Sequence, residues 1–138
     1  MGLSRLPRSR PTGSIANVPN KILIVDDDPR FRAAATELLA ARGFEVVAVA
    51  ADGEQALAAA ADGCPDGILL DINLPGPDGF TVAASLAAAC PAARIVLTSA
   101  AMGEVSARVL AECAATAFVP KDELAVADLR TLLRPAGR

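Results

Sequence analysis

Apolar residues occur along this chain in two alternating patterns. Short continuous apolar runs bounded by turn residues indicate buried strands, and apolar residues three and four positions apart indicate helices with one buried face. The runs predict five strands, at residues 21–25, 44–50, 67–71, 94–99 and 117–119. The helical spacing predicts five helices, at about residues 29–42, 52–61, 79–90, 103–115 and 123–133. This alternation predicts a doubly wound α/β fold, in which right-handed crossovers cover both faces of a parallel sheet.

Residues that favour helix ends support several of these boundaries. Pro29 suits the first turn of a helix, and Gly43 suits the position after its last turn. Asp52, with Gln55 three residues later, resembles a capping box, although Asp replaces the usual Ser or Thr. The order of the strands in the sheet cannot be read from these patterns.

Two of the predicted strands end in acidic residues. Asp26, Asp27 and Asp28 follow the first strand, and Asp71 ends the third. The Pro-rich segment 75–77 excludes a helix directly after Asp71. If the two strands are neighbours, these carboxylates converge, and two like charges about 4 Å apart repel by roughly 4 kcal/mol at an effective dielectric constant of about 20. A hard divalent cation would relieve the repulsion, and oxygen-only ligands favour Mg²⁺ over Zn²⁺.

Composition narrows the possible functions. The 138 residues include no histidine, which excludes Ser-His-Asp and Cys-His catalytic sites and most catalytic zinc sites. The net charge is −3, and the first segment carries three arginines and no acid, so the remainder is at about −6. An acidic body is unsuited to unaided binding of DNA or a membrane surface. No apolar run approaches the ~18 residues of a membrane span, and the N-terminal arginines precede no apolar signal segment.

The three cysteines favour an intracellular location. Cys64, Cys90 and Cys113 are far apart in the sequence, odd in number and form no C-x-x-C pair. We therefore expect three free thiols in a reducing cytosol, and a cytoplasmic protein.

Four motifs in order carry a family resemblance. They are VDDDP, DINLPGPDG, IVLTSA and FVPK, and together they resemble the receiver domain of bacterial two-component response regulators, with the chemotaxis regulators as a near likeness. The resemblance covers about residues 20–133 and implies a flavodoxin-like sheet with strand order 2-1-3-4-5. Residues 1–19, rich in Ser, Pro, Gly and Arg, are expected to form a flexible N-terminal extension, and residues 134–138 a short C-terminal tail. No second domain follows, so we expect a stand-alone receiver.

The resemblance implies a phosphoacceptor and its metal ligands. Asp71 would attack the phosphorus of a phosphohistidine or a small acyl phosphate and become an aspartyl phosphate. Mg²⁺ would be held by Asp27 and Asp71 directly, by Asp26 directly or through water, and by the backbone carbonyl of Asn73. Asp28 has no role in the family pattern, and we interpret it as a solvated acid at the start of a helix.

The remaining family positions are those that would contact the phosphoryl group or respond to it. Lys121 would pair with the phosphoryl oxygens. A hydroxyl would also contact them; spacing from the phosphoacceptor favours Ser99, whereas the strand pattern alone allows Thr98. Phe118 stands where many members carry the Tyr of the switch, although a plain core aromatic is an alternative. The sequence departs from the family after Lys121, because Asp122 replaces the common Pro.

The implied function is a phosphorelay signalling switch. The expected partners are a sensor histidine kinase or phosphotransfer protein, a downstream protein target, and a second copy of the chain on phosphorylation. We expect no enzyme activity beyond the chain's own phosphorylation and dephosphorylation. One alternative is an Asp-nucleophile, Mg²⁺-dependent phosphohydrolase of the haloacid dehalogenase type, but that class needs a second Asp where Asn73 stands. The other is a phosphorylation-independent, receiver-like interaction module. A dinucleotide-binding domain is excluded, because no G-x-G-x-x-G follows a strand.

Overall fold

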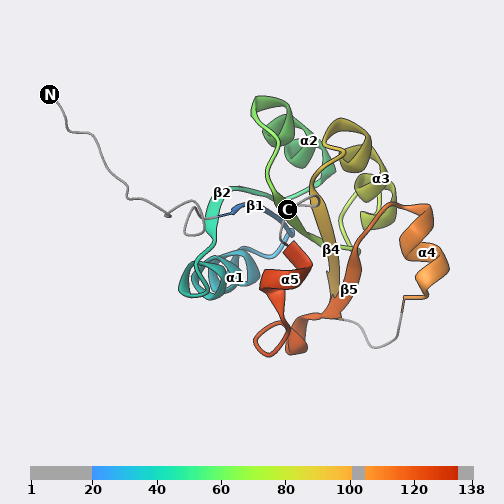
Figure 1. The fold of residues 1–138 in the computed structure, drawn as a ribbon. Helices are drawn as coiled ribbons and strands as arrows, with labels where there is room; N and C mark the ends of the chain where they lie inside the picture. The colour runs from blue at the N-terminus through green and yellow to red at the C-terminus, as the bar shows by residue number, and fades with distance from the viewer. Residues whose placement is uncertain (1–19, 101–104, 134–138) are drawn as a thin grey trace, which may run out of the picture.

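The computed structural model describes residues 20–100 and 105–133 (Figure 1). The expected N-terminal extension, residues 1–19, and the expected tail, residues 134–138, lie outside the described residues, as do residues 101–104. The strands are β1 (Lys21–Val25), β2 (Glu45–Ala50), β3 (Gly67–Asp71), β4 (Arg94–Ser99) and β5 (Ala117–Pro120). The described helices are α1 (Pro29–Ala41), α2 (Gly53–Asp62), α3 (Gly79–Ala89), α4 (Ala107–Glu112) and α5 (Leu129–Leu133), and a 3-10 turn spans Lys121–Glu123.

The strands form one parallel sheet in the order β2-β1-β3-β4-β5, which confirms the predicted fold class and strand order. β1 lies between β2 and β3, with Val25 paired to Leu70. The carboxyl ends of β1 and β3 are therefore side by side. The two acidic segments that follow these strands meet at this edge.

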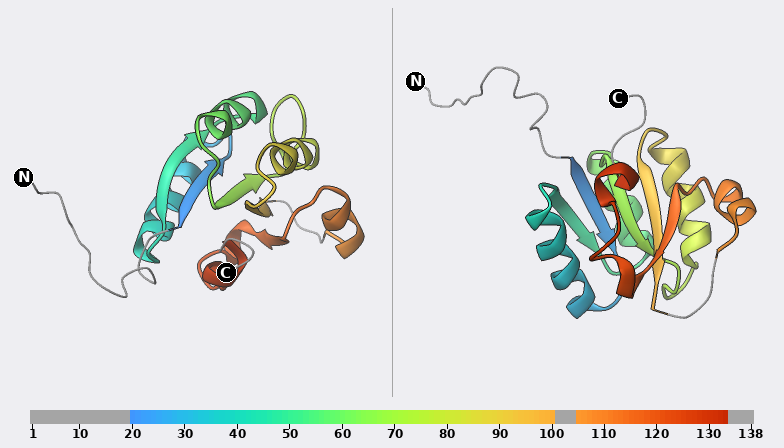
Figure 2. Two further views of the ribbon diagram at one scale, coloured as in Figure 1. Left: turned by 45° about the horizontal axis from the view of Figure 1, so that its top comes forward. Right: turned by 60° about the horizontal axis from the view of Figure 1, so that its bottom comes forward.

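Helices cover both faces of the sheet, and two apolar cores result (Figure 2). Alternate residues of β1 point to opposite faces: Ile22 and Ile24 pack with α1 and α5, whereas Leu23 and Val25 pack with α2 and α3. Because both faces are covered, β1 and β3 are apolar without alternation. None of the helices in the described ranges has the length and apolar character that a membrane span requires.

Acidic side chains begin α1, α2 and α3. Asp52 accepts a 2.8 Å hydrogen bond from the N–H of Gln55, whose own side chain accepts one from the N–H of Ala51, as expected for a capping box. Asp28 accepts a 2.9 Å bond from the N–H of Arg30, and Asp78 begins α3 in a similar way. The helix-start interpretation of Asp28 is thus confirmed.

The last two predicted helices are too long. The helix predicted at 103–115 corresponds to α4; its first two predicted residues lie outside the described residues, and Ser106, which accepts a hydrogen bond from the N–H of Val109, begins the helix at Ala107. The helix predicted at 123–133 is a 3-10 turn followed by the short α5. The side chain of Asp128 accepts hydrogen bonds from the backbone N–H and the hydroxyl of Thr131, which begins a new helix at this point.

The prediction of three free thiols is wrong for two of them. Cys64 and Cys90 form a disulfide, with their Cα atoms 5.6 Å apart. Cys113 is free and buried, as expected. The pairing arises because β3 runs along the sheet and α3 returns antiparallel to it, which brings the loop before β3 next to the residue after α3. Twenty-six positions of sequence separation conceal this proximity.

Candidate functional site

Three carboxylates gather at the carboxyl edge of the sheet. Asp26 and Asp27 follow β1, and Asp71 ends β3. One oxygen from each lies within 4.8 Å of the others. Asp26 is fully buried and Asp71 is 4% exposed, whereas Asp27 is open to solvent. The convergence predicted from neighbouring strands is therefore present.

Backbone groups orient the two buried carboxylates. The N–H of Asp28 donates a 2.8 Å hydrogen bond to Oδ1 of Asp26, and the N–H of Asn73 donates a 3.0 Å bond to Oδ1 of Asp71. In both cases the donor lies two residues further along the chain, in the loop after the strand. The second oxygen of each carboxylate faces the side chain of Lys121.

Lys121 lies beside both carboxylates. Its Nζ atom is 2.7 Å from Oδ2 of Asp26 and 3.6 Å from Oδ2 of Asp71. The same atom lies 4.2 Å from the centre of the Phe31 ring, a cation–π contact from the first turn of α1. Burial alone would lower the pKa of the Lys121 ammonium, but the carboxylate of Asp26 and then that of Asp71 outweigh it, so the pKa is raised.

Asp71 bears a charge that its surroundings disfavour. Burial raises the pKa of the Asp71 carboxyl, the N–H of Asn73 lowers it, the nearby Asp26 carboxylate raises it, and Lys121 lowers it, with a net rise. A second positive charge in the site would stabilise the ionised form. Three carboxylates without nitrogen or sulfur donors suit a hard cation such as Mg²⁺.

The two candidate hydroxyls have different partners. Thr98 is fully buried, and its Oγ1 donates a 2.6 Å hydrogen bond to the carbonyl of Val119 on β5. Ser99 is at the end of β4, and its Oγ accepts a 2.8 Å bond from the side-chain amide of Asn73. Ser99 is therefore next to the loop that follows Asp71, whereas Thr98 joins two strands of the sheet.

Phe118 lies on β5, three residues before Lys121. It is paired with Leu97 of β4 and is half-buried against the apolar core on the α3 side of the sheet. The structure thus brings Asp26, Asp27, Asp71 and Lys121 together, and sets Ser99 and Asn73 beside them.

Sequence reasoning missed two residues from the first turns of α1. The Phe31 ring contacts Lys121, and the Arg32 guanidinium donates a 2.7 Å hydrogen bond from Nη1 to the backbone carbonyl of Asp26. Helical spacing identified Phe31 only as a residue of the buried face. No sequence signal marks Arg32, because its partner is a backbone atom.

Comparisons with known proteins agree with this geometry. A family model described as the response regulator receiver domain matches residues 22–134. The chain is 39% identical over 87 residues to chemotaxis protein CheY of Bacillus subtilis, covering 63% of this chain and 72% of that protein. It is 43% identical over 89 residues to a protein-glutamate methylesterase/protein-glutamine glutaminase of Myxococcus xanthus, covering 64% of this chain and 25% of the relative.

A solved structure gives the same picture. A two-component response regulator of the LuxR family from Aurantimonas sp. SI85-9A1 superposes with a TM-score of 0.73 and 30% identity, over 83% of this chain and 81% of that one. This chain spans only about a quarter of the length of two methylesterase relatives, 24% of one and 25% of the other.

Proposed function

Because the chain belongs to the response regulator receiver family, whose members act in phosphorelay signalling, we propose that Asp71 is the residue that accepts the phosphoryl group. The observation that carries this proposal is the position of Asp71. It is nearly buried at the end of a central strand, with two further carboxylates within 4.8 Å and the Lys121 ammonium at 3.6 Å.

The proposed step is a displacement at phosphorus. An oxygen of the Asp71 carboxylate attacks the phosphorus of a phosphohistidine, the phosphorus–nitrogen bond breaks, and the imidazole leaves with the bonding electron pair. Lys121 then pairs with the new phosphoryl oxygens in place of the two carboxylates. Ser99, rather than Thr98, donates a hydrogen bond from its hydroxyl to a phosphoryl oxygen, because the hydroxyl of Thr98 already donates to the carbonyl of Val119 on β5.

A Mg²⁺ ion fits the donor set of this site. We propose that Asp26, Asp27, Asp71 and the backbone carbonyl of Asn73 hold it. When bound, the ion would neutralise charge on the carboxylates and on the transferred phosphoryl group. The raised pKa of Asp71 supports the need for additional positive charge.

Neither alternative function finds support in the site. A phosphohydrolase would need an acid at position 73 to protonate a leaving group, but Asn73 donates its amide to Ser99. An interaction module independent of phosphorylation would not need three convergent carboxylates, whose mutual repulsion is unfavourable. We therefore propose that the chain catalyses only its own phosphorylation and dephosphorylation.

The partners follow from the chemistry. The chain contains no histidine, so its phosphohistidine donor is a separate sensor kinase or phosphotransfer protein, and we propose that both act in the cytoplasm. A phosphorylated receiver of residues 20–133 would then bind a downstream protein or a second copy of itself. Direct binding of nucleic acid is not proposed, because the chain is acidic.

Phosphotransfer is the direct test. Purified histidine kinases from the source organism would be phosphorylated with radiolabelled ATP and mixed briefly with the chain. We expect rapid transfer of label from one or a few of them to the wild-type chain, in an acid-stable and base-labile form typical of an acyl phosphate. Failure of every kinase, together with failure of acetyl phosphate, would refute the proposal.

Metal affinity is expected to depend on Asp27 and not on Asp28. Asp27 offers an oxygen to the carboxylate cluster, whereas Asp28 bonds the N–H of Arg30 at the start of α1. Asp27→Ala should weaken Mg²⁺ binding by roughly tenfold or more, since a charged ligand is lost. Asp28→Ala should change it by less than about twofold, although the lost cap should cost about 1 kcal/mol of stability.

Calorimetric titration of both variants with Mg²⁺ would measure the difference. The two variants are matched, because each removes one exposed carboxylate from the same acidic run. Equal losses of affinity would show that the effect comes from net charge and not from coordination.

Phe118 is expected to couple the phosphoryl group to the surface formed by α4, β5 and α5. Its half-buried ring lies on β5 beside β4, the strand that ends in Ser99. If Ser99 moves toward a phosphoryl oxygen, the space behind β4 changes, and a ring with two rotamers can respond. Phe118→Ala should therefore leave phosphorylation of Asp71 intact, but abolish the response across residues 105–133.

Hydrogen exchange with and without beryllofluoride would test this coupling. The wild-type protein and Phe118→Tyr, which keeps the ring, should both show altered exchange across residues 105–133. Phe118→Ala should show changes only around Asp71. If the wild-type protein also shows no change beyond the loops around Asp71, the coupling role is wrong.

A further inference from the structure

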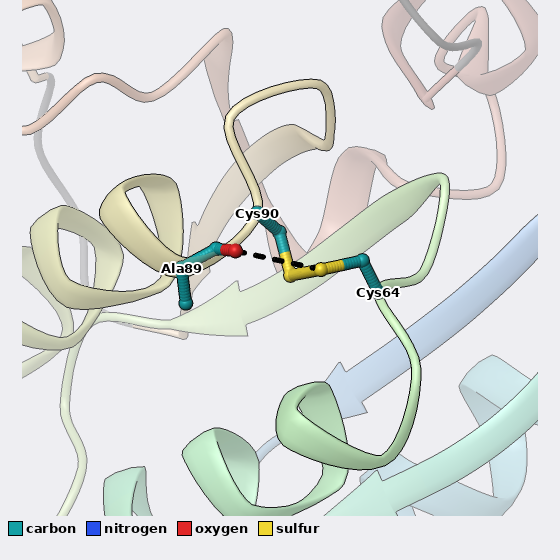
Figure 3. Close-up of a disulfide and its surroundings, with 3 residues drawn as sticks. All are labelled: Cys64, Ala89 and Cys90. Atoms are coloured by element: carbon teal, nitrogen blue, oxygen red, sulfur yellow. Dashed lines mark hydrogen bonds between the residues drawn. A yellow bond between two sulfur atoms is a disulfide. The ribbon is translucent and has the colours of Figure 1, made fainter.

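A disulfide links the loop before β3 to the end of α3 (Figure 3). Cys64 lies in the loop between α2 and β3, and Cys90 is the residue that ends α3. No step of the proposed phosphoryl transfer uses either sulfur. The crosslink therefore calls for its own explanation.

The two halves of the disulfide differ in their access to solvent. Cys64 is exposed, whereas Cys90 is only 2% exposed and belongs to the apolar core that α2 and α3 form with the sheet. The exposure of Cys64 makes it the half that a thiolate from solution would attack, with Cys90 as the leaving group. Exposed disulfides are the ones that exchange most readily with small thiols.

The reduced form also fits the structure. The Cys64 sulfur lies 3.5 Å from the carbonyl oxygen of Ala89 (Figure 3). A sulfur in a disulfide has no proton to donate, but the thiol of reduced Cys64 could donate a weak hydrogen bond to this oxygen at the end of α3. Reduced Cys90 would remain a small apolar side chain in the core.

Backbone contacts keep the two sulfurs close without the crosslink. Two residues after Cys64, the N–H of Asp66 donates a 2.7 Å hydrogen bond to the carbonyl of Lys21. The carbonyl of Asp66 accepts a 3.0 Å hydrogen bond from the N–H of Arg94. The N–H of Cys90 donates a 2.7 Å bond to the carbonyl of Leu86. Both cysteines are thus held by the sheet and the helix, which favours closure of the same pair after reduction.

The crosslink closes a covalent ring around the phosphoacceptor unit. The ring runs from Cys64 through β3, Asp71, the loop that follows it and α3 to Cys90. In the oxidised form the two ends of this unit are covalently joined. In the reduced form the end of α3 is held only by non-covalent contacts.

We propose that Cys64 and Cys90 form a reversible thiol–disulfide site that exchanges with low-molecular-weight thiols and disulfides of the glutathione type, and that locks the β3–α3 unit when oxidised. Oxidation begins when the Cys64 thiolate attacks one sulfur of the small disulfide and releases one small thiolate. Cys90 then attacks the Cys64 sulfur, which expels the second small thiolate and forms the protein disulfide. The two cysteines lose two electrons and two protons, and the small disulfide becomes two thiols.

Reduction follows the reverse route. A small thiolate attacks the Cys64 sulfur, Cys90 leaves as a thiolate and takes a proton, and a second small thiolate releases Cys64 with formation of the small disulfide. This chemistry is independent of phosphorylation, so its test and the test of the phosphoacceptor have separate outcomes.

Redox titration of the full chain would test reversibility. The native protein would be equilibrated in buffers with graded ratios of reduced and oxidised glutathione, then unfolded in denaturant that contains an alkylating agent, so that buried thiols also react, and weighed intact. We expect a single monomeric transition between a form with one alkylated cysteine and a form with three, identical from the reduced and the oxidised side. Persistence of the disulfide in excess reduced glutathione, or of both thiols in excess oxidised glutathione, would overturn the proposal.

Single variants would test the entry point. Cys90→Ser should form a mixed disulfide with glutathione at Cys64, whereas Cys64→Ser should leave Cys90 unmodified under native conditions, and the buried Cys113 should stay unmodified in both. Equal modification at positions 64 and 90 would refute Cys64 as the entry point.

Hydrogen exchange of wild-type protein, oxidised and reduced, would test the lock without any variant. The last turn of α3, around residues 86–90, should exchange at least about tenfold more slowly when oxidised, while α1 should exchange equally in both forms. Equal protection of the α3 end in the two forms would refute the lock.

Discussion

Replacement of Asp71 by Asn is expected to abolish phosphorylation and, at neutral pH, to stabilise the fold. Asn keeps the shape of the side chain but lacks the carboxylate nucleophile, so acetyl phosphate with Mg²⁺ should add mass to the wild-type chain and none to the variant. The stabilisation follows from the raised pKa of Asp71, which burial and the Asp26 carboxylate cause. We expect a gain of about 1 kcal/mol, because repulsion of a few kcal/mol in this geometry is partly offset by Lys121.

The pH dependence has a definite sign. A carboxyl with a raised pKa binds a proton more tightly in the folded state than in the unfolded state. The contribution of Asp71 to the stability of the wild-type protein should therefore fall as the pH rises from 3.8, the ordinary value, through the raised value. Asp71→Asn lacks this loss, so the two stability curves should diverge with increasing pH.

Urea denaturation between pH 4 and 7, followed by circular dichroism without Mg²⁺, would measure both curves. Asp78→Asn is a matched control, since it removes an exposed carboxylate from the next loop and Asn begins a helix about as well as Asp. This control should remain phosphorylated and show no comparable divergence. Equal phosphorylation of Asp71→Asn and the wild-type protein would refute the assignment of the phosphoacceptor.

The sheet and its acidic edge could be predicted because buried parallel strands have a simple signature. β3 is a continuous apolar run that ends in Asp71, and the prolines after it exclude a helix, so both the strand and the loop follow from local sequence. The strand order could not be read from these runs, since β1, β3 and β4 are buried on both faces and their apolar residues do not specify which strand lies beside them. The family resemblance supplied the order.

The predictions that failed depend on contacts between residues distant in sequence, or on hydrogen bonds of single polar side chains. The leucines near the C-terminal end of the described chain fit one long helix as well as a turn and a short helix, and the Asp128 side chain decides between them. The Cys64–Cys90 disulfide could not be predicted from the sequence, because the two residues meet only when α3 packs back along β3. Phe31 fits the apolar spacing of α1 whether or not it contacts Lys121, so the sequence gives no indication of this contact.

Gly79→Ala is expected to be the most destabilising single methyl addition among the glycines of the described chain. A Cβ atom at this position would lie 2.3 Å from the Cα of Ile72 and 2.5 Å from the carbonyl oxygen of Asp71. Both are backbone atoms of Asp71, the proposed phosphoacceptor, and of the residue after it, and the N–H of Gly79 also donates a 3.0 Å hydrogen bond to the carbonyl of Ile72. Neither the helix nor the loop can move without disturbing the site.

We expect a loss of roughly 3 kcal/mol of stability, or a melting temperature lower by about 10 °C. This sign is opposite to the usual effect of Gly→Ala in a helix, which favours Ala by up to about 1 kcal/mol. Phosphorylation by acetyl phosphate should also slow in the variant that remains folded, because the loop that orients Asp71 is displaced.

Two other glycines serve as matched controls for this prediction. Gly53 also occupies the first position of a helix after an Asp, but its added Cβ would meet a methyl group of Val82 at 2.6 Å, which is a side chain that can shift. Gly63 has open space around the same position. Thermal and urea denaturation should therefore rank the losses as Gly79→Ala, then Gly53→Ala, with Gly63→Ala within about 0.5 kcal/mol of the wild-type protein. A Gly79→Ala variant as stable as Gly63→Ala would show that the loop after Asp71 yields to the methyl group, and that the close approach of α3 does not fix the phosphoacceptor.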